Sequence, residues 1–75
     1  MSAVVSTPSL RLRVNGRDRE VVPGAAVADL VRELAPEARL IAVERNGEIV
    51  PRARWGSTPL ATGDRIEIVR FVQGG

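Results

Sequence analysis

The 75-residue sequence contains no cysteine, histidine, lysine or tyrosine. Without cysteine and histidine, the chain can form no disulfide and lacks the usual ligands of zinc, copper and iron–sulfur centres. It also lacks a partner for a nucleophile–base pair of the Ser–His or Cys–His kind. The sequence therefore predicts a carrier or binding module that has no catalytic residues of its own and binds no metal or cofactor.

All 11 basic side chains are arginine, and nine acidic ones leave a formal net charge of +2. The sequence pI of about 11.0 arises because no side chain titrates between the carboxylates and the guanidinium groups. Basic and acidic residues alternate closely, as in Arg17-Asp18-Arg19-Glu20. We interpret this alternation as a solvated surface of mixed charge, and we expect no nucleic-acid partner.

The length predicts one small domain, and a hydrophobic content of 44% is enough for one core. We expect a flexible N-terminal tail over residues 1–8, a folded domain over 9–72 and a flexible reactive tail over 73–75. The first nine residues lack the features of a signal peptide, and no stretch approaches the roughly 18 apolar residues of a membrane span. We therefore expect a cytoplasmic protein without a membrane partner.

Apolar residues alternate with arginine over 10–14, which predicts a half-buried strand. Asn15-Gly16 follows and is typical of a tight hairpin turn, because both residues tolerate positive φ. Residues 17–22 are the predicted return strand, and Pro23-Gly24 ends it.

One helix is predicted next, because four apolar residues follow at spacings of i, i+3, i+4 and i+7. They are Val27, Leu30, Val31 and Leu34. Pro36 ends this helix, since proline donates no backbone hydrogen bond. Its start is predicted to be weak, because Ala25-Ala26 supplies no capping side chain.

A second Asn-Gly pair at 46–47 predicts a turn between a strand over 40–44 and a short strand over 48–50. Gly63-Asp64 predicts a further turn before the last strand, over 65–72.

Residues 52–62 are expected to be irregular, with Trp55 closing one end of the core. Four or five strands and one helix, in this order, predict an α+β domain with a mixed sheet packed on the helix. With the first and last strands adjacent at the centre, this is the β-grasp (ubiquitin-like) fold.

The sequence given ends in Gln73-Gly74-Gly75, directly after the last predicted strand. Glycine has no Cβ, so such a segment can pass a narrow channel into the active site of another protein. A carboxylate is a poor electrophile, but its acyl-adenylate has a leaving group that sulfur can displace. We expect Gly75 to be the reacting residue and Gly74 its channel-fitting neighbour.

The last strand also suggests a docking surface. Val69 and Phe71 lie on the parity opposite to Ile66 and Ile68, so they reach the sheet face away from the helix unless a β-bulge or a covering loop intervenes. An exposed apolar patch there would suit a partner, and Arg70, near the base of the tail, could pair with a partner carboxylate. The expected docking residues are Val69, Arg70, Phe71, Val72 and Gln73.

Two motifs carry a family resemblance, and they are Val50-Pro51-Arg52-Ala53-Arg54-Trp55 and Val72-Gln73-Gly74-Gly75. With them the chain resembles the ThiS sulfur-carrier family of thiamin biosynthesis, which has a Val-Pro-Arg-x-x-Trp segment. The resemblance runs from about Leu10 to Gly75. It includes the segments Val14-Asn15-Gly16, Val27-Ala28-Asp29-Leu30, Val43-Glu44-Arg45-Asn46-Gly47 and Leu60-Ala61-Thr62-Gly63-Asp64-Arg65-Ile66-Glu67-Ile68-Val69. Ala26 departs from the family, which commonly has a capping threonine there.

This resemblance implies a cycle with three partners. A ubiquitin-activating-like adenylyltransferase would use ATP and magnesium to adenylate Gly75. A sulfur donor such as a cysteine desulfurase would supply the sulfur for a thiocarboxylate. Thiazole synthase would then take that sulfur for the thiazole ring.

Other readings remain open at this point. The small subunit of molybdopterin synthase, or another β-grasp sulfur carrier, would share the chemistry and differ in the acceptor. A ubiquitin-like protein modifier would form an isopeptide bond instead. A nucleic-acid-binding module is disfavoured, since it would need clustered basic residues and exposed aromatics, and aromatic content is 3%.

Overall fold

The computed structural model describes residues 8–37 and 39–71. The strands are β1 (Leu10–Val14), β2 (Arg17–Val21), β3 (Ile41–Arg45), β4 (Glu48–Ile49) and β5 (Arg65–Arg70), and the helices are α1 (Val27–Leu34) and the 3-10 helix η1 (Arg52–Ser57). Within this part of the chain, no helix is long and apolar enough to cross a membrane. The two predicted tails, apart from Pro8, lie outside the described residues.

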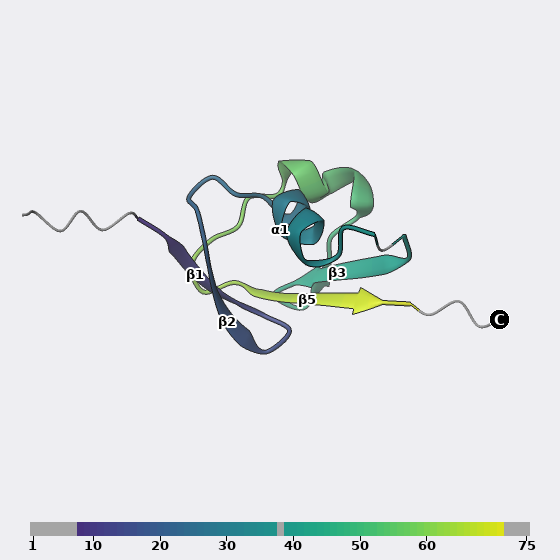
Figure 1. Ribbon diagram of the computed structural model, residues 1–75, viewed down its shortest axis with the longest axis horizontal. Helices are drawn as coiled ribbons and strands as arrows, with labels where there is room; N and C mark the ends of the chain where they lie inside the picture. Colours follow the sequence, from purple (N-terminus) through teal and green to yellow (C-terminus); the bar gives the residue numbers. More distant parts are fainter. Residues whose placement is uncertain (1–7, 38, 72–75) are drawn as a thin grey trace, which may run out of the picture.

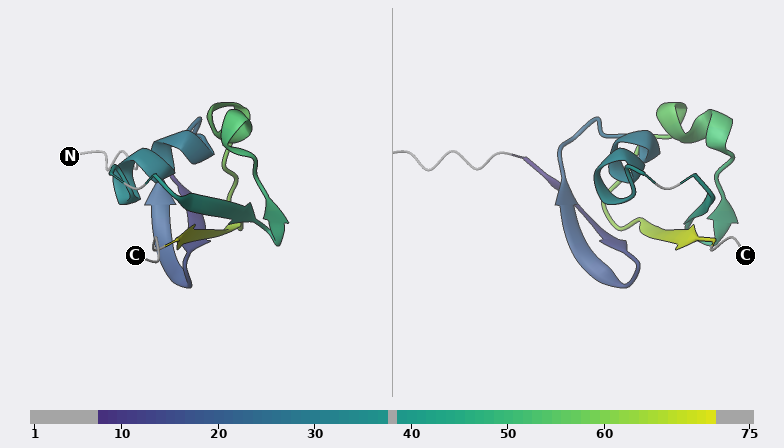
Figure 2. Two further views of the ribbon diagram at one scale, coloured as in Figure 1. Left: turned by 90° about the vertical axis from the view of Figure 1, so that its right-hand side faces the viewer. Right: turned by 45° about the vertical axis from the view of Figure 1, so that its right-hand side comes forward.

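The five strands form one mixed sheet in the order β2-β1-β5-β3-β4. β1 and β5 are parallel neighbours at the centre, and the other pairs are antiparallel. Helix α1 lies across one face of the sheet, and the described residues place no helix on the other face (Figures 1 and 2). The β-grasp prediction is therefore confirmed, with five strands.

Both Asn-Gly turns form where they were predicted. Asn15 and Gly16 have φ values of 51° and 80°, and Asn46 and Gly47 have 53° and 87°. Two successive residues with positive φ match the twist of a two-residue hairpin. Each return strand ends one residue earlier than predicted, at Val21 and Ile49.

Helix α1 runs from the first to the last residue of the predicted apolar stripe, Val27 to Leu34, but its start is more strongly stabilised than predicted. Ala26 is the N-cap and has no capping side chain. Asp29 compensates, because its Oδ2 accepts a hydrogen bond from the Ala26 backbone N–H at 2.8 Å. This hydrogen bond lowers the pKa of Asp29, with a further contribution from Arg32 and against a smaller effect of desolvation.

The prediction that residues 52–62 are irregular is wrong in part, because residues 52–57 form η1. Local hydrogen bonds build this helix: the Arg54 N–H donates to the Pro51 carbonyl at 2.8 Å. The Thr58 hydroxyl donates to the Arg54 carbonyl at 2.7 Å and ties the end of the turn. Such short-range contacts leave no hydrophobic periodicity in the sequence, so periodicity cannot reveal them.

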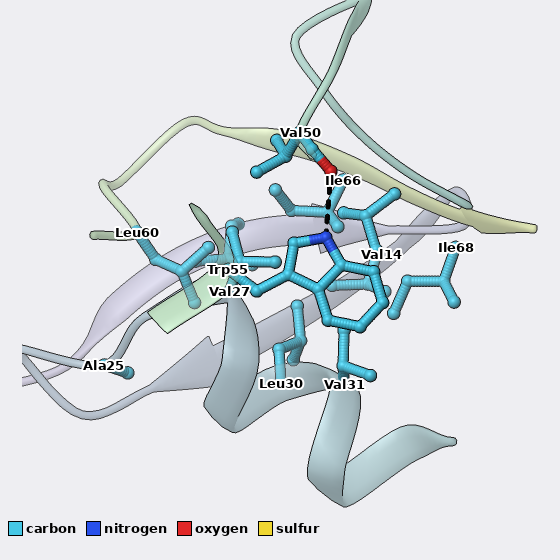
Figure 3. Packing of buried hydrophobic residues seen from close by; sticks show 12 residues of the cluster. Val14, Ala25, Val27, Leu30, Val31, Val50, Trp55, Leu60, Ile66 and Ile68 are labelled. Carbon is cyan, nitrogen blue, oxygen red and sulfur yellow. Dashed lines mark hydrogen bonds between the residues drawn. The ribbon is translucent and has the colours of Figure 1, made fainter. Parts of the chain in front are cut away.

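Trp55 closes one end of the core, as predicted, with 8% of its surface exposed. Its indole N–H donates to the Val50 carbonyl at 2.9 Å, and the ring faces side chains of α1 and the sheet (Figure 3). The Arg52 guanidinium lies 4.6 Å from the ring centroid and donates to the Arg39 carbonyl at 2.7 Å. The Pro-Arg-x-x-Trp segment therefore has a structural role here.

The rest of the core comes from α1 and the inward positions of the strands. The most deeply buried side chains are Leu12, Val27, Leu30, Val43 and Ile66.

We expect Trp55→Phe to lower the free energy of unfolding by about 1–3 kcal/mol, because it shrinks the core and leaves the Val50 carbonyl without its donor. Urea denaturation followed by circular dichroism measures the loss. Arg52→Gln is the control, since it removes the cation outside the ring and should cost less than about 1 kcal/mol. Equal losses in the two variants would contradict a core role for the indole.

Candidate functional site

β5 leads into the C-terminal segment that carries the predicted reactive glycine. Its pairing with β3 is unbroken from Arg45↔Ile66 to Ile41↔Arg70, so no β-bulge intervenes. Val69 and Phe71 are 42% and 57% exposed. Of the alternatives that the parity of the strand left open, the structure shows the exposed one, with both side chains on the face away from α1.

The end of β5 is fixed from both sides. The Phe71 backbone N–H donates to the Leu40 carbonyl at 2.8 Å. The Arg70 guanidinium donates to the Leu34 carbonyl at 2.7 Å, at the C-terminal end of α1, where a cation is favourable. The remaining predicted site residues, Val72, Gln73, Gly74 and Gly75, lie outside the described part of the chain.

Asn15 has a second role that its turn signal did not reveal. Pairing of β1 with β5 ends at Val14↔Ile66. Beyond that point the Asn15 side chain takes the place of a strand residue: its Oδ1 accepts from the Ile68 N–H at 2.8 Å, and its Nδ2 donates to the Ile68 carbonyl at 3.4 Å. The side chain thus satisfies both backbone groups of Ile68.

Asp64 anchors the start of β5 and is only 5% exposed. Its carboxylate accepts hydrogen bonds from Arg45 Nε at 2.9 Å, Asn46 Nδ2 at 3.0 Å and the Ala61 backbone N–H at 2.9 Å. Burial by itself raises the pKa of Asp64, but these hydrogen bonds and the charge of Arg45 outweigh it, and the pKa lies below its ordinary value. The carboxylate is therefore charged near neutral pH and structural in role.

The alternating charges of residues 17–20 are divided between the two faces of β2, and ion pairs with neighbouring elements, Arg13–Asp18 and Arg19–Glu33, keep both signs on each face. Arg17 and Arg19 lie opposite the buried β1 residues Val14 and Leu12, on the α1 side of the sheet. The acidic residues between and after them lie on the other face, because successive strand residues point to opposite sides. Alternation along β2 therefore places its two arginines on one face and its two acidic residues on the other.

Among residues 8–37 and 39–71, no group of three or more acidic side chains is placed to hold a metal ion. The described residues instead form a rigid base for the segment that follows Phe71. They offer an apolar strip on one face of β5 and arginines on the other.

The model of the ThiS family matches residues 12–75. The chain belongs to the ThiS family. It is 37% identical, over 65 residues, to the sulfur carrier protein ThiS of Bacillus subtilis, covering 85% of this chain and 98% of that protein. A crystal structure of the thiamine biosynthesis protein ThiS from Geobacter metallireducens superposes with a TM-score of 0.75 at 32% identity, covering 88% of this chain and 100% of that one.

Two thiazole synthases also contain a ThiS-like stretch. The protein from Paramagnetospirillum magneticum is 39% identical over 66 residues, and the one from Magnetococcus marinus is 32% identical over 66 residues. Each match covers 88% of this chain and 20% of the relative. The chain therefore spans about a fifth of the length of these two proteins.

We expect the hydrogen bonds of Asp64 to make the free energy of unfolding fall at acidic pH. The pKa of Asp64 is lower in the folded state than in the unfolded state. The charged Asp64 therefore contributes fully to the free energy of unfolding above the unfolded pKa of about 3.9, and this contribution is lost as the pH falls through the folded pKa. Urea denaturation of the wild type and of Asp64→Asn between pH 7 and pH 2 measures this. The variant should show a smaller loss of stability below pH 4.

At pH 7 we expect Asp64→Ala to cost about 2–3 kcal/mol, since it leaves Arg45 and Asn46 without their acceptor. Identical acid dependence in the wild type and Asp64→Asn would contradict the assigned role.

Proposed function

We propose that this ThiS-family chain is a sulfur carrier of thiamin biosynthesis, in which the Gly75 carboxylate accepts sulfur and passes it on. The observation that carries the proposal is the family match, which continues to Gly75 itself. The similarity to the Bacillus subtilis sulfur carrier, over 98% of its length, supports the same role.

The chemistry follows from the properties of a carboxylate. Its charge is delocalised and it has no good leaving group, so sulfur cannot displace an oxygen directly. A carboxylate oxygen of Gly75 would attack the α-phosphorus of ATP and release pyrophosphate, and a sulfide equivalent would then displace AMP to leave a thiocarboxylate. The net change is one sulfur in place of one oxygen.

The machinery for these steps would belong to partners in the cytoplasm. A ubiquitin-activating-like adenylyltransferase would hold ATP and magnesium, and a sulfur donor such as a cysteine desulfurase would supply the sulfide equivalent. This chain would contribute the substrate carboxylate and a docking surface. Gly74 would let the main chain enter the partner's active site, because it has no Cβ to block the channel.

Thiazole synthase is the proposed acceptor. In two relatives named thiazole synthase, a ThiS-like stretch is part of the same polypeptide. Joining two proteins raises the effective concentration of one at the other, which favours a working partnership between a ThiS-like unit and the synthase.

The proposed docking surface is the outer face of β5. Val69 and Phe71 are exposed apolar side chains on that face, adjacent to the segment that must enter the partner. With Val72 and Gln73 beyond the described residues, they would contact the adenylyltransferase. Arg70, also expected in this surface, lies instead on the α1 side of β5, where it bonds the Leu34 carbonyl. Burying Val69 and Phe71 would hold the partner's active site within reach of Gly75.

We expect the full chain, incubated with its adenylyltransferase, ATP, magnesium and sulfide, to gain the mass difference of one sulfur for one oxygen. Intact-mass spectrometry measures it. A variant without Gly75 is the control and should keep its mass. An unchanged wild-type mass, with an activating enzyme that is competent on another carrier, would refute the sulfur-carrier proposal.

We expect Phe71→Ser and Val69→Ser each to weaken binding to the adenylyltransferase about tenfold, since each removes a large part of an apolar side chain from the interface. Isothermal titration calorimetry measures the affinity. Val22→Ser is the matched control, because Val22 is 65% exposed and lies just after edge strand β2. If all three variants bind alike, the β5 face is not the docking surface.

A further inference from the structure

A cleft of about 670 Å³ lies where the β1–β2 hairpin, the end of α1 and the end of β5 meet. Its lining residues are Val14, Asn15, Arg17, Asp18, Arg19, Leu34, Ile68 and Arg70. The cleft is on the α1 side of the sheet, away from the strip formed by Val69 and Phe71. Nothing in the sulfur-carrier proposal uses it.

Three arginines share this cleft because of strand parity. Arg17 and Arg19 occupy the inward positions of β2, and Arg70 follows the inward residues Ile66 and Ile68 on β5. Residues on the packed face of a sheet are commonly apolar and face the core. Here α1 ends at Leu34, and the guanidinium groups line an open space instead.

The positive charge of the cleft is only partly compensated within the described residues. Arg19 pairs with Glu33 of α1 through one terminal nitrogen, but its Nε is buried and has no hydrogen-bond acceptor. Arg17 has no ion-pair partner there, and Arg70 bonds a carbonyl, not a carboxylate. A buried donor without an acceptor is costly, so an acceptor brought by a ligand would be favourable.

The single acidic residue in the lining does little to offset this charge. Asp18 accepts a hydrogen bond from Arg13 Nε at 3.2 Å, and Arg13 lies outside the cleft lining. The cleft therefore favours an anionic ligand.

The backbone of Arg70 adds a second feature. Phe71 and Leu40 share a β3–β5 hydrogen bond, so the N–H and C=O of Arg70, one residue earlier, point away from β3 toward the cleft. The pairing of β1 with β5 ends at Val14↔Ile66. The Asn15 side chain hydrogen-bonds Ile68, which is two residues before Arg70. The cleft thus presents a backbone donor and a backbone acceptor beside its guanidinium groups.

We propose that this cleft binds an acidic, extended segment of a partner protein. Side-chain carboxylates of the segment would pair with Arg17 and Arg19, and its main chain would hydrogen-bond the Arg70 backbone as an added strand does. A backbone carbonyl directed away from β3 suits a peptide N–H and disfavours a phosphate. The cleft would thus bind a partner on the α1 side of β5, independently of the chemistry at Gly75.

The test is a nuclear magnetic resonance titration of the full chain with an acetylated Glu-Val-Glu-Val-Glu peptide. We expect shifts in the amide signals of Arg17, Arg19 and Arg70 and in the Arg19 Nε–H signal. Arg17→Gln should weaken the apparent affinity about tenfold, as expected for the loss of a charge-assisted hydrogen bond. The matched control, Arg11→Gln, removes the same charge from the other face of the sheet and should change affinity less than about twofold.

Three outcomes would overturn the proposal. The first is a titration in which the cleft signals do not move. The second is equal binding of the Gln-Val-Gln-Val-Gln peptide, because carboxylates would then not be recognised. The third is binding of inorganic phosphate or an oligouridylate to the same signals at least as tightly as the acidic peptide. Sulfur loading of Gly75, measured separately by mass, does not depend on any of these results.

Discussion

The parallel pairing of β1 with β5 is the constraint on which the rest of the structure depends. Parallel neighbours cannot be joined by a tight turn, so the chain between them must cross the sheet, and α1 makes that crossing. The inward side chains of the two central strands, with Leu12 and Ile66 nearly inaccessible to solvent, then form the floor on which α1 packs. The edge strands and η1 complete the enclosure of this core.

Polar side chains extend this central pairing where the backbone ladder ends. Asn15 bonds both backbone groups of Ile68. Asn46 accepts from the Arg65 N–H at 2.8 Å and donates to Asp64. Each Asn-Gly turn therefore reverses the chain direction in a hairpin, and its asparagine side chain also hydrogen-bonds the backbone of β5. A strand held in this way at its start and along its length can present its last residues in a defined position.

β5 offers two chemically different faces near its end. The face away from α1 carries exposed apolar side chains, and the α1 side borders a cleft of arginines. A partner that approaches the C-terminal segment can contact either face, because the two lie on opposite sides of one strand. In the proposed function, this arrangement would let a chain of 75 residues, with little volume for a deep active site, interact with larger proteins through its surface.

The sequence by itself determined the elements and their order, because hydrophobic period, Asn-Gly turns and Pro36 are local signals. It also determined that Val69 and Phe71 lie on the parity opposite to Ile66 and Ile68, but only the unbroken β3–β5 pairing excluded a bulge and showed that both are exposed. Only the tertiary structure decided what the polar residues do. The hydrophobic period of the sequence does not reveal these contacts. They include the turn of η1, the hydrogen bonds of Asn15 to Ile68 and the hydrogen bonds of Asp64. The same holds for the cleft: Arg70 is far in sequence from Arg17 and Arg19, and it is the pairing of β1 with both β2 and β5 that brings the three together.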